Sequence, residues 1–148
     1  MVPAAKNFNT QTYRSNRGLT MKTKKTEGKT DLKLSLNILK IVSANNAFYF
    51  FTDIGQCTDR CSACLADFCN AIQTIDVKSV EFHFKRGDFA IWIRETLGDS
   101  ELANKINRVK KTIRGEELRT TIHQAVENRL TKLKKLQASE EPYLKRVE

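Results

Sequence analysis

The sequence predicts a mainly α-helical fold: a compact array of about five helices, with at most one or two short extended segments near the N-terminus. Three observations support this prediction. From residue 58 onward, apolar residues recur every three or four positions, which is the period of an amphipathic helix. Residues that can cap a helix and glycines that can end one punctuate the same region. The connections between these segments are short, as in bundle-like arrays.

The first two predicted helices lie on either side of residue 76. Thr58 or Asp59 can cap a helix that runs to about residue 75. Its inner face would consist of Cys61, Cys64, Leu65, Phe68 and Ile72. Asp76 can cap a second helix, which Gly87 ends.

The third and fourth predicted helices follow the same punctuation. Asp88 would cap the third, and Gly98 would end it. The fourth would begin at Asp99 or Ser100 and end at Gly115. Their inner stripes would consist of Phe89, Trp92, Ile93 and Thr96, then of Leu102, Ile106, Val109 and Ile113.

The longest predicted helix runs from about residue 116 to residue 136. Its apolar band comprises Leu118, Ile122, Ala125, Val126, Leu130, Leu133 and Leu136. The folded domain is therefore expected to span residues 32–138, and residues 139–148 are expected to form a short C-terminal tail.

The N-terminal third of the chain has weaker signals. Residues 1–31 are polar and lack an apolar period, so they are predicted to form a disordered basic tail. Apolar residues between 32 and 39 fit a strand and a helix equally well. The run from Phe48 to Thr52 is typical of a short buried extended segment, and Gly55 would supply the turn after it.

The charge of the chain is concentrated near its N-terminus. The net charge is +9, of which residues 1–31 supply +5 and residues 32–148 supply +4. A basic tail attracts polyanions such as RNA, or acidic protein surfaces, without sequence specificity. No stretch approaches the ~20 apolar residues of a membrane-spanning helix, so we expect no membrane association and a cytoplasmic location. Met1 and Met21 are both candidates for the true start of the chain.

The four cysteines lie close together in the sequence, at positions Cys57, Cys61, Cys64 and Cys69. The spacing of the first three matches the motif that holds a 4Fe-4S cluster in radical enzymes that use S-adenosylmethionine. Those enzymes are large barrels, and this chain has neither the length nor the alternating strands and helices of one. Four thiolates also suit zinc, but on a continuous helix Cys69 would point about 140° away from Cys64.

Packing is therefore the favoured role of the cysteines, and no cofactor or metal is expected. Two alternatives stay open: a metal site formed by the four thiols, and a redox role for Cys61 and Cys64 near a helix N-terminus, where the helix dipole lowers a thiol pKa.

His83 has two neighbouring carboxylates, Asp88 and Glu81, and Ser79 lies one helical turn before it. A serine beside a histidine and a carboxylate is the pattern of a nucleophile with its base. The sequence identifies no oxyanion hole to accompany it, so we predict no catalytic residue and no enzyme activity. We expect His83 instead to make a structural hydrogen bond that ties the second helix to Asp88.

The basic residues offer a candidate surface for polyanions. The candidates are Lys22, Lys24, Lys25, Arg108, Lys110, Lys111, Lys132, Lys134 and Lys135. If the last two helices pack antiparallel, the two sets of cations on them would face each other and form one cationic stripe. Solvated helix charge is the alternative interpretation.

The segment from Ser79 to Trp92 also carries a family resemblance. Ser79, His83, Asp88, Phe89 and Trp92 follow the pattern Ser, then an aromatic residue and His, then Gly-Asp-Phe and Trp. With Phe48-Tyr49-Phe50 before them and Leu97-Gly98-Asp99 after them, the chain over about residues 45–136 resembles a small helical domain of unknown function that is mainly archaeal. A similar pattern occurs beside domains of sensory or phosphotransfer proteins, which implies a module that binds or docks. The resemblance implies no catalytic residues, and the clustered cysteines and the basic tail depart from it.

Together these observations predict a non-enzymatic interaction module that docks an unidentified protein through the corner from His83 to Trp92 or through the last helix. A nucleic-acid-binding or ribosome-associated basic protein is the first alternative. A cysteine-based metal or redox sensor is the second.

Overall fold

The computed structural model describes residues 20–144, and the surroundings of their side chains from residue 28 to residue 139. The described chain is mainly helical, as predicted, with six α-helices and one two-stranded sheet. The elements in chain order are α1 (Thr20–Ile38), a 3-10 turn (Ala44–Asn46), β1 (Phe48–Asp53), β2 (Gln56–Ser62), α2 (Leu65–Thr74), α3 (Val77–Arg86), α4 (Asp88–Trp92), a π-helical turn (Ile93–Leu97), α5 (Ser100–Asn107) and α6 (Gly115–Leu144).

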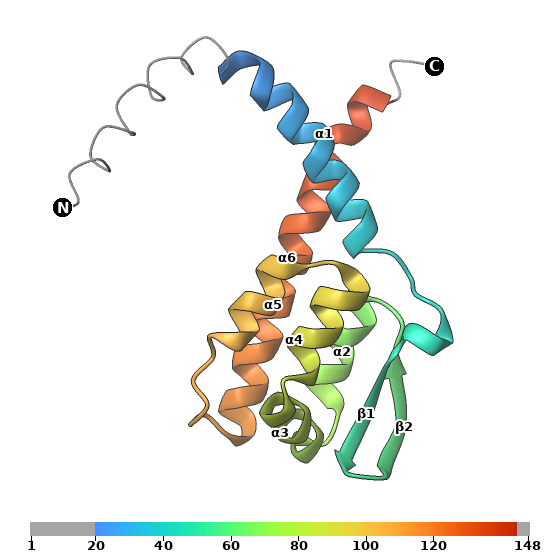
Figure 1. Ribbon diagram of the computed structural model, residues 1–148, viewed down its shortest axis with the longest axis vertical. Coiled ribbons are helices and arrows are strands. Elements are labelled where there is room, and N and C mark those ends of the chain that lie inside the picture. Colours follow the sequence, from blue (N-terminus) through green and yellow to red (C-terminus); the bar gives the residue numbers. More distant parts are fainter. Residues whose placement is uncertain (1–19, 145–148) are drawn as a thin grey trace, which may run out of the picture.

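The long helix α6 organises the molecule. Helices α2 to α5 gather along its first half, and the β-hairpin lies on the far side of α2 and α3 from α5 (Figure 1). Helix α1 leaves this body and crosses the second half of α6. The body is therefore built on one face of the first half of α6, and α1 and the second half of α6 form an extension above it.

The β-hairpin corrects the prediction of a helix from residue 58. Strands β1 and β2 pair antiparallel, with Phe48 opposite Ser62 and Tyr49 opposite Cys61. A buried extended segment such as β1 needs partners for its backbone N–H and C=O groups, and β2 supplies them across the turn at Gly55. The helical spacing of Cys61, Cys64 and Leu65 was misleading, because α2 begins only at Leu65.

Helix α3 has the predicted boundaries. The Asp76 carboxylate accepts a hydrogen bond from the Lys78 N–H at 2.9 Å, and Gly87 ends the helix with a φ of 75°. Asp88, however, is the first residue of α4 and not its cap. Its carboxylate is used elsewhere, as described below.

Helix α5 is shorter than predicted. It begins at Ser100 with Asp99 as its cap and ends at Asn107. The residues from Arg108 to Arg114, which were predicted to continue this helix, form the turn before α6. Val109 and Ile113 are only half-buried as a result.

Helix α6 is longer than predicted. It begins at Gly115 and continues to Leu144, well past the predicted end at residue 136. The expected C-terminal tail from residue 139 is therefore helical as far as residue 144, and residues 145–148 lie outside the described part.

Helix α1 replaces a segment that was predicted to be disordered up to residue 31 and was undecided from 32 to 39. Residues 20–38 are helical, and Ser35 and Ile38 are buried on the side that packs against α6. The packing partner is remote in the sequence, so the local pattern does not show it. Residues 1–19 of the predicted tail lie outside the described residues.

An aromatic cluster forms the core between the hairpin and the helices. The ring of Phe48 lies 4.9 Å from Phe50 and 5.6 Å from Trp92, and Phe68 and Phe89 pack beside them. Trp92 is only 8% exposed, and its Nε1–H donates to the Asn46 carbonyl at 2.8 Å. The prediction that Trp92 belongs to the core is confirmed.

Candidate functional site

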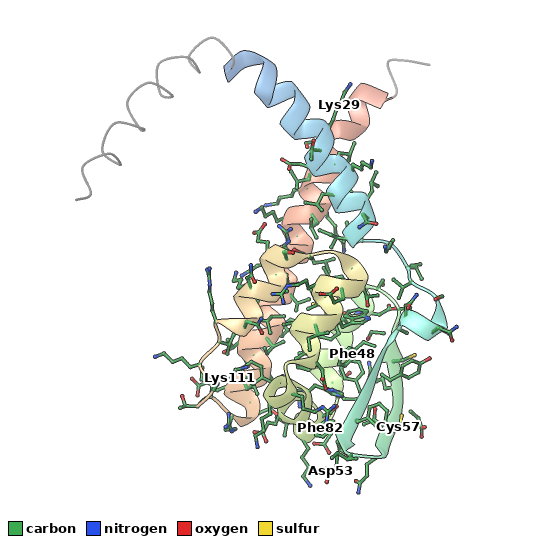
Figure 2. The ribbon with its side chains drawn as sticks, in the orientation of Figure 1. Lys29, Phe48, Asp53, Cys57, Phe82 and Lys111 are labelled. Atoms are coloured by element: carbon green, nitrogen blue, oxygen red, sulfur yellow. The ribbon has the colours of Figure 1, made fainter. Side chains whose placement is uncertain are left out.

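A hollow of about 370 Å³ opens between the hairpin and the C-terminal half of α3. We call it the hairpin hollow. Its lining comes from Ala47, Phe48, Tyr49, Phe51, Asp53, Ile54, Gly55, Phe82, His83, Arg86 and Asp88. Figure 2 shows Asp53 at the hairpin turn and Phe82 on α3 close by. Most of the lining is apolar or aromatic; its charged or titratable groups are His83 and Arg86 on α3, Asp88 at the start of α4, and Asp53 at the hairpin turn.

His83 joins three elements at the base of this hollow. Its Nδ1 lies 2.8 Å from the Asp88 carboxylate, and the backbone N–H of Phe51 donates to its Nε2 at 2.8 Å. Because Nε2 accepts a hydrogen bond, the proton of the neutral ring resides on Nδ1 and is donated to Asp88. The predicted bond between His83 and Asp88 is present, and the bond to strand β1 is an addition that the sequence did not show.

Burial is the main influence on the charge of His83. It lowers the pKa of His83 below the ordinary value of 6.5, while the hydrogen bond and the charge of Asp88 act in the opposite direction. The nearby Arg86 adds to the lowering. His83 is therefore held as the neutral ring that this hydrogen-bond pattern requires.

The geometry leaves His83 poorly placed to act as a base. Both ring nitrogens already have partners, so neither is free to take a proton from a substrate. The Ser79 hydroxyl is buried and has no hydrogen-bond partner within the described part of the chain. Glu81 is occupied elsewhere, because its Oε1 accepts a hydrogen bond from the Gly115 N–H at 2.7 Å and so caps α6.

The rim of the hairpin hollow combines exposed apolar groups with one fixed cation. Ile54 at the hairpin turn is 81% exposed, and Tyr49 is also exposed. The Arg86 Nε–H donates to Asp88 at 3.0 Å, and its guanidinium carbon lies 5.1 Å from the centre of the Phe82 ring. Asp88 and Phe82 thus hold the guanidinium in one orientation.

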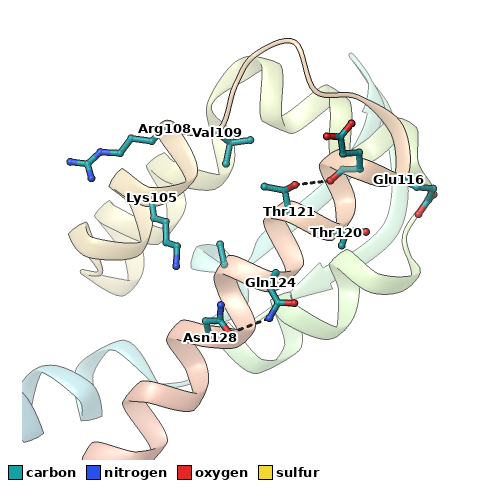
Figure 3. A pocket seen from close by; sticks show the side chains of 10 residues that line it. Lys105, Arg108, Val109, Glu116, Thr120, Thr121, Gln124 and Asn128 are labelled. Carbon is teal, nitrogen blue, oxygen red and sulfur yellow. Dashed lines mark hydrogen bonds between the residues drawn. The ribbon is translucent and has the colours of Figure 1, made fainter.

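A second and larger groove of about 780 Å³ lies between α5 and α6 (Figure 3). Lys105 and Arg108 stand on its α5 side, and Thr120, Gln124 and Asn128 on its α6 side. Within α6 the Gln124 amide already donates to Asn128 at 3.1 Å. None of the Ser79–Trp92 motif residues lines this groove, whereas His83 and Asp88 of that motif line the hairpin hollow, so we favour the hairpin hollow as the candidate site.

The predicted single cationic stripe does not form. Helices α5 and α6 are antiparallel, since Glu101 at the start of α5 meets Arg129 and Lys132 of α6. But α5 ends at Asn107, so Arg108, Lys110 and Lys111 lie in the turn that precedes α6. From Gly115 to Lys132 the helix rises about 25 Å, which separates the two sets.

The remaining polyanion candidates are scattered. Lys132 pairs with Glu101 at 3.0 Å, and the Lys111 ammonium lies 4.1 Å from the centre of the Phe84 ring. Lys134 and Lys135 are exposed on α6. The backbone of α1 includes Lys22, Lys24 and Lys25, whose side chains lie outside the described ones.

A buried ion pair between Asp99, the cap of α5, and Arg129 of α6 was not predicted from the sequence. The Arg129 guanidinium donates to both Asp99 oxygens, at 2.8 and 3.0 Å, and to Glu101 at 2.6 Å. Hydrogen bonding from Lys132 is the main cause that lowers the pKa of Glu101; burial opposes it, and the charges of Arg129 and Lys132 add to the lowering. The available signal was the position of Arg129, which lies within the apolar band of its helix beside Val126 and Leu133.

The cysteines are not gathered into one site. Cys57 and Cys61 are exposed on β2, Cys64 is half-buried at the N-terminus of α2, and Cys69 is buried in α2, where burial raises the pKa of its thiol. The packing interpretation therefore applies to Cys69 and is wrong for Cys57 and Cys61. In the described residues, no group of three or more His, Cys, Asp or Glu side chains is arranged to hold a metal ion.

The fold and this hollow define a small, mainly helical domain with a hairpin that packs its aromatic residues into the core. Comparison with known families adds one finding: residues 85–144 match a family of unknown function (DUF5752). The predicted similarity to a domain of unknown function is confirmed at that level. The match includes Asp88, Phe89 and Trp92 and begins after His83. No curated protein and no solved structure matches the chain significantly. None of the helices from residue 20 to 144 has the length and apolar character needed to cross a membrane.

Proposed function

We propose that the chain is a non-enzymatic interaction module that binds a partner protein at the hairpin hollow. The partner would insert a large aliphatic or aromatic side chain between β1 and α3. The observation that carries this proposal is a concave, aromatic-lined hollow whose rim exposes Ile54 to solvent.

The dimensions and composition of the hollow support binding. A volume of about 370 Å³ falls within the usual range of ligand-binding pockets, which are mostly apolar with a few fixed polar groups. Asp88 and Phe82 orient Arg86, so this cation can bind an acidic group of the partner without first losing side-chain freedom. The hydrogen bonds of His83 support a structural role, since they fix the hairpin to α3.

The setting of the module belongs to the same proposal. We place the module in the cytoplasm, where exposed thiols such as those of Cys57 and Cys61 are reduced unless an oxidant acts on them. The wider resemblance over residues 45–136, with its mainly archaeal distribution and its Ser79–His83 pattern, also belongs to the proposal and not to the family match.

Two matched variants test the docking surface. Ile54 lies on the rim of the hollow and Ile41 lies away from it, and they are 81% and 79% exposed. Affinity purification of tagged protein from native cells should lose a partner with Ile54→Asp and retain it with Ile41→Asp. A partner retained by both variants, or lost equally from both, would contradict the proposal.

Nucleic-acid binding is the second candidate function. The turn between α5 and α6 contains four basic residues and no acidic one, and none of the four pairs with a carboxylate of the described chain: Arg108, Lys110, Lys111 and Arg114. If this turn binds RNA, Lys110→Ala should weaken binding and reduce its salt dependence, whereas Lys40→Ala should not. Equal binding by the two variants would exclude the turn.

A further inference from the structure

The two exposed cysteines of β2 are brought together by an irregularity of the hairpin. Tyr49 lies opposite Cys61 and Phe51 lies opposite Cys57. Two steps along β1, from Tyr49 to Phe51, therefore face four steps along β2, and the additional residues of β2 form a β-bulge. Four steps along a regular strand span about 13 Å, but the two partner positions on β1 are only about 6.6 Å apart. The bulge thus shortens the distance between the two cysteines by about half.

The orientation of the two side chains follows from the same register. Residues that face each other across an antiparallel pair project to the same side of the sheet, and so do residues two apart on one strand. Cys57 and Cys61 therefore project to the face that carries Tyr49 and Phe51. Both are exposed, so a soluble oxidant can reach both thiols. From this register and the rise of a strand we infer a Cα separation of about 6.6 Å for the two cysteines, at the upper end of the range in which a disulfide forms.

The bulge between the cysteines is also strained. Asp59 has a φ of 61°, the one positive φ of a non-glycine residue in the described chain. Such a conformation persists where the surrounding structure imposes it, and strained bulges occur often beside functional positions. The Thr58 hydroxyl donates to the Phe50 carbonyl at 2.8 Å and helps to fix the bulge on its β1 side.

We propose that Cys57 and Cys61 form a redox-active pair that closes into an intramolecular disulfide across the bulge, with a small-molecule disulfide as oxidant. The thiolate of one cysteine attacks a sulfur of oxidised glutathione, forms a mixed disulfide and releases one glutathione thiolate. The second cysteine's thiolate then attacks the protein sulfur of the mixed disulfide and releases the other glutathione. The two thiols lose two electrons and two protons in total, and the oxidant gains them.

The other two cysteines are not part of this pair. Cys64 lies beyond the end of β2, at the start of α2, and is half-buried. Cys69 is buried in α2. The pair is therefore Cys57 with Cys61 and not Cys61 with Cys64, which the sequence spacing suggested.

Disulfide mapping of the full, native chain tests this pairing. Trypsin cuts after Arg60, so Cys57 falls in the peptide 41–60 and the other three cysteines in the peptide 61–78. After treatment with oxidised glutathione, the monomer should be lighter by two hydrogen atoms, and the two peptides should stay joined until a reductant is added. The Cys64→Ser and Cys69→Ser variants should keep the joined peptides, and Cys57→Ser and Cys61→Ser should lose them.

Three results would overturn the proposal. The peptides of the oxidised wild type could separate without reductant, which would mean that Cys57 forms no disulfide. They could stay joined in Cys61→Ser, which would assign Cys57 to Cys64 or Cys69. The oxidised protein could instead be a covalent dimer, which would make the disulfide intermolecular.

Discussion

At the scale of single residues, Trp92 and His83 make the hydrogen bonds that link the helices to the hairpin and to the turn before it. Trp92 fills the space between the hairpin and α2, and its indole N–H reaches the chain at Asn46. His83 fixes Phe51 with one ring nitrogen and Asp88 with the other. Both residues connect the hairpin region to the helices, so replacing either one tests the packing contact on which the candidate site depends.

Replacing Trp92 should destabilise the fold strongly. We expect Trp92→Ala to lower the free energy of unfolding by about 3–5 kcal/mol, because it opens a cavity in the aromatic core and leaves the Asn46 carbonyl without its donor. The control is Ile91→Ala, at the adjacent and exposed position, which should change it by no more than about 0.5 kcal/mol. Denaturant unfolding measures both, and similar midpoints for the two variants would refute the core assignment.

His83 should make stability depend on pH. Its folded pKa lies below 6.5, so as the pH falls below that value the unfolded chain binds a proton before the folded chain does. The contribution of His83 to the free energy of unfolding is therefore at its full value above pH 6.5, and it decreases as the pH falls toward the folded pKa. His83→Asn should reduce this slope, which denaturant unfolding at a series of pH values measures. A slope that survives His83→Asn would assign it to another group.

At the scale of elements, contacts between helix ends and turns decide where each element stops. Glu81 on α3 caps α6, and Asp99 caps α5 while it also binds Arg129 of α6. The caps Asp76 and Asp99 and the stops Gly87 and Gly98 were predictable, because their effect depends on their own backbone. Asp88 was predicted as a cap and instead binds His83, a contact that only the tertiary structure brings about.

The Arg129 ion pair should be the strongest polar link between α5 and α6. Arg129→Ala is expected to cost about 3–5 kcal/mol, because it leaves Asp99 buried without its counter-charge. Lys132 also contacts α5, through an exposed ion pair with Glu101, and Lys132→Ala should cost no more than about 1 kcal/mol. Thermal unfolding of the two variants compares them directly. A small effect of Arg129→Ala would show that water replaces the guanidinium.

At the scale of the whole molecule, the sequence predicted the class of fold and most of the helical body. The prediction was wrong where a segment packs against a part of the chain that is remote in sequence, and where the apolar residues of a strand happen to have helical spacing. A helix was predicted from Thr58 or Asp59 on its apolar period, but residues 56–62 instead form β2, whose backbone pairs with that of β1. Helix α1 is stabilised by the distant second half of α6. Of the motif residues, Ser79, His83, Phe89 and Trp92 are buried, whereas the rim residue Ile54 had no sequence signal beyond its place in a turn.

Site-specific photocrosslinking can show whether a partner protein occupies the hairpin hollow. A photoreactive amino acid would replace Ile54 on the rim or, as the control, Ile41 on the linker before β1. After irradiation of native cells, we expect the chain to form a discrete covalent adduct with another protein from position 54 and none from position 41. Equal adducts from both positions, or an adduct from position 41 alone, would contradict it.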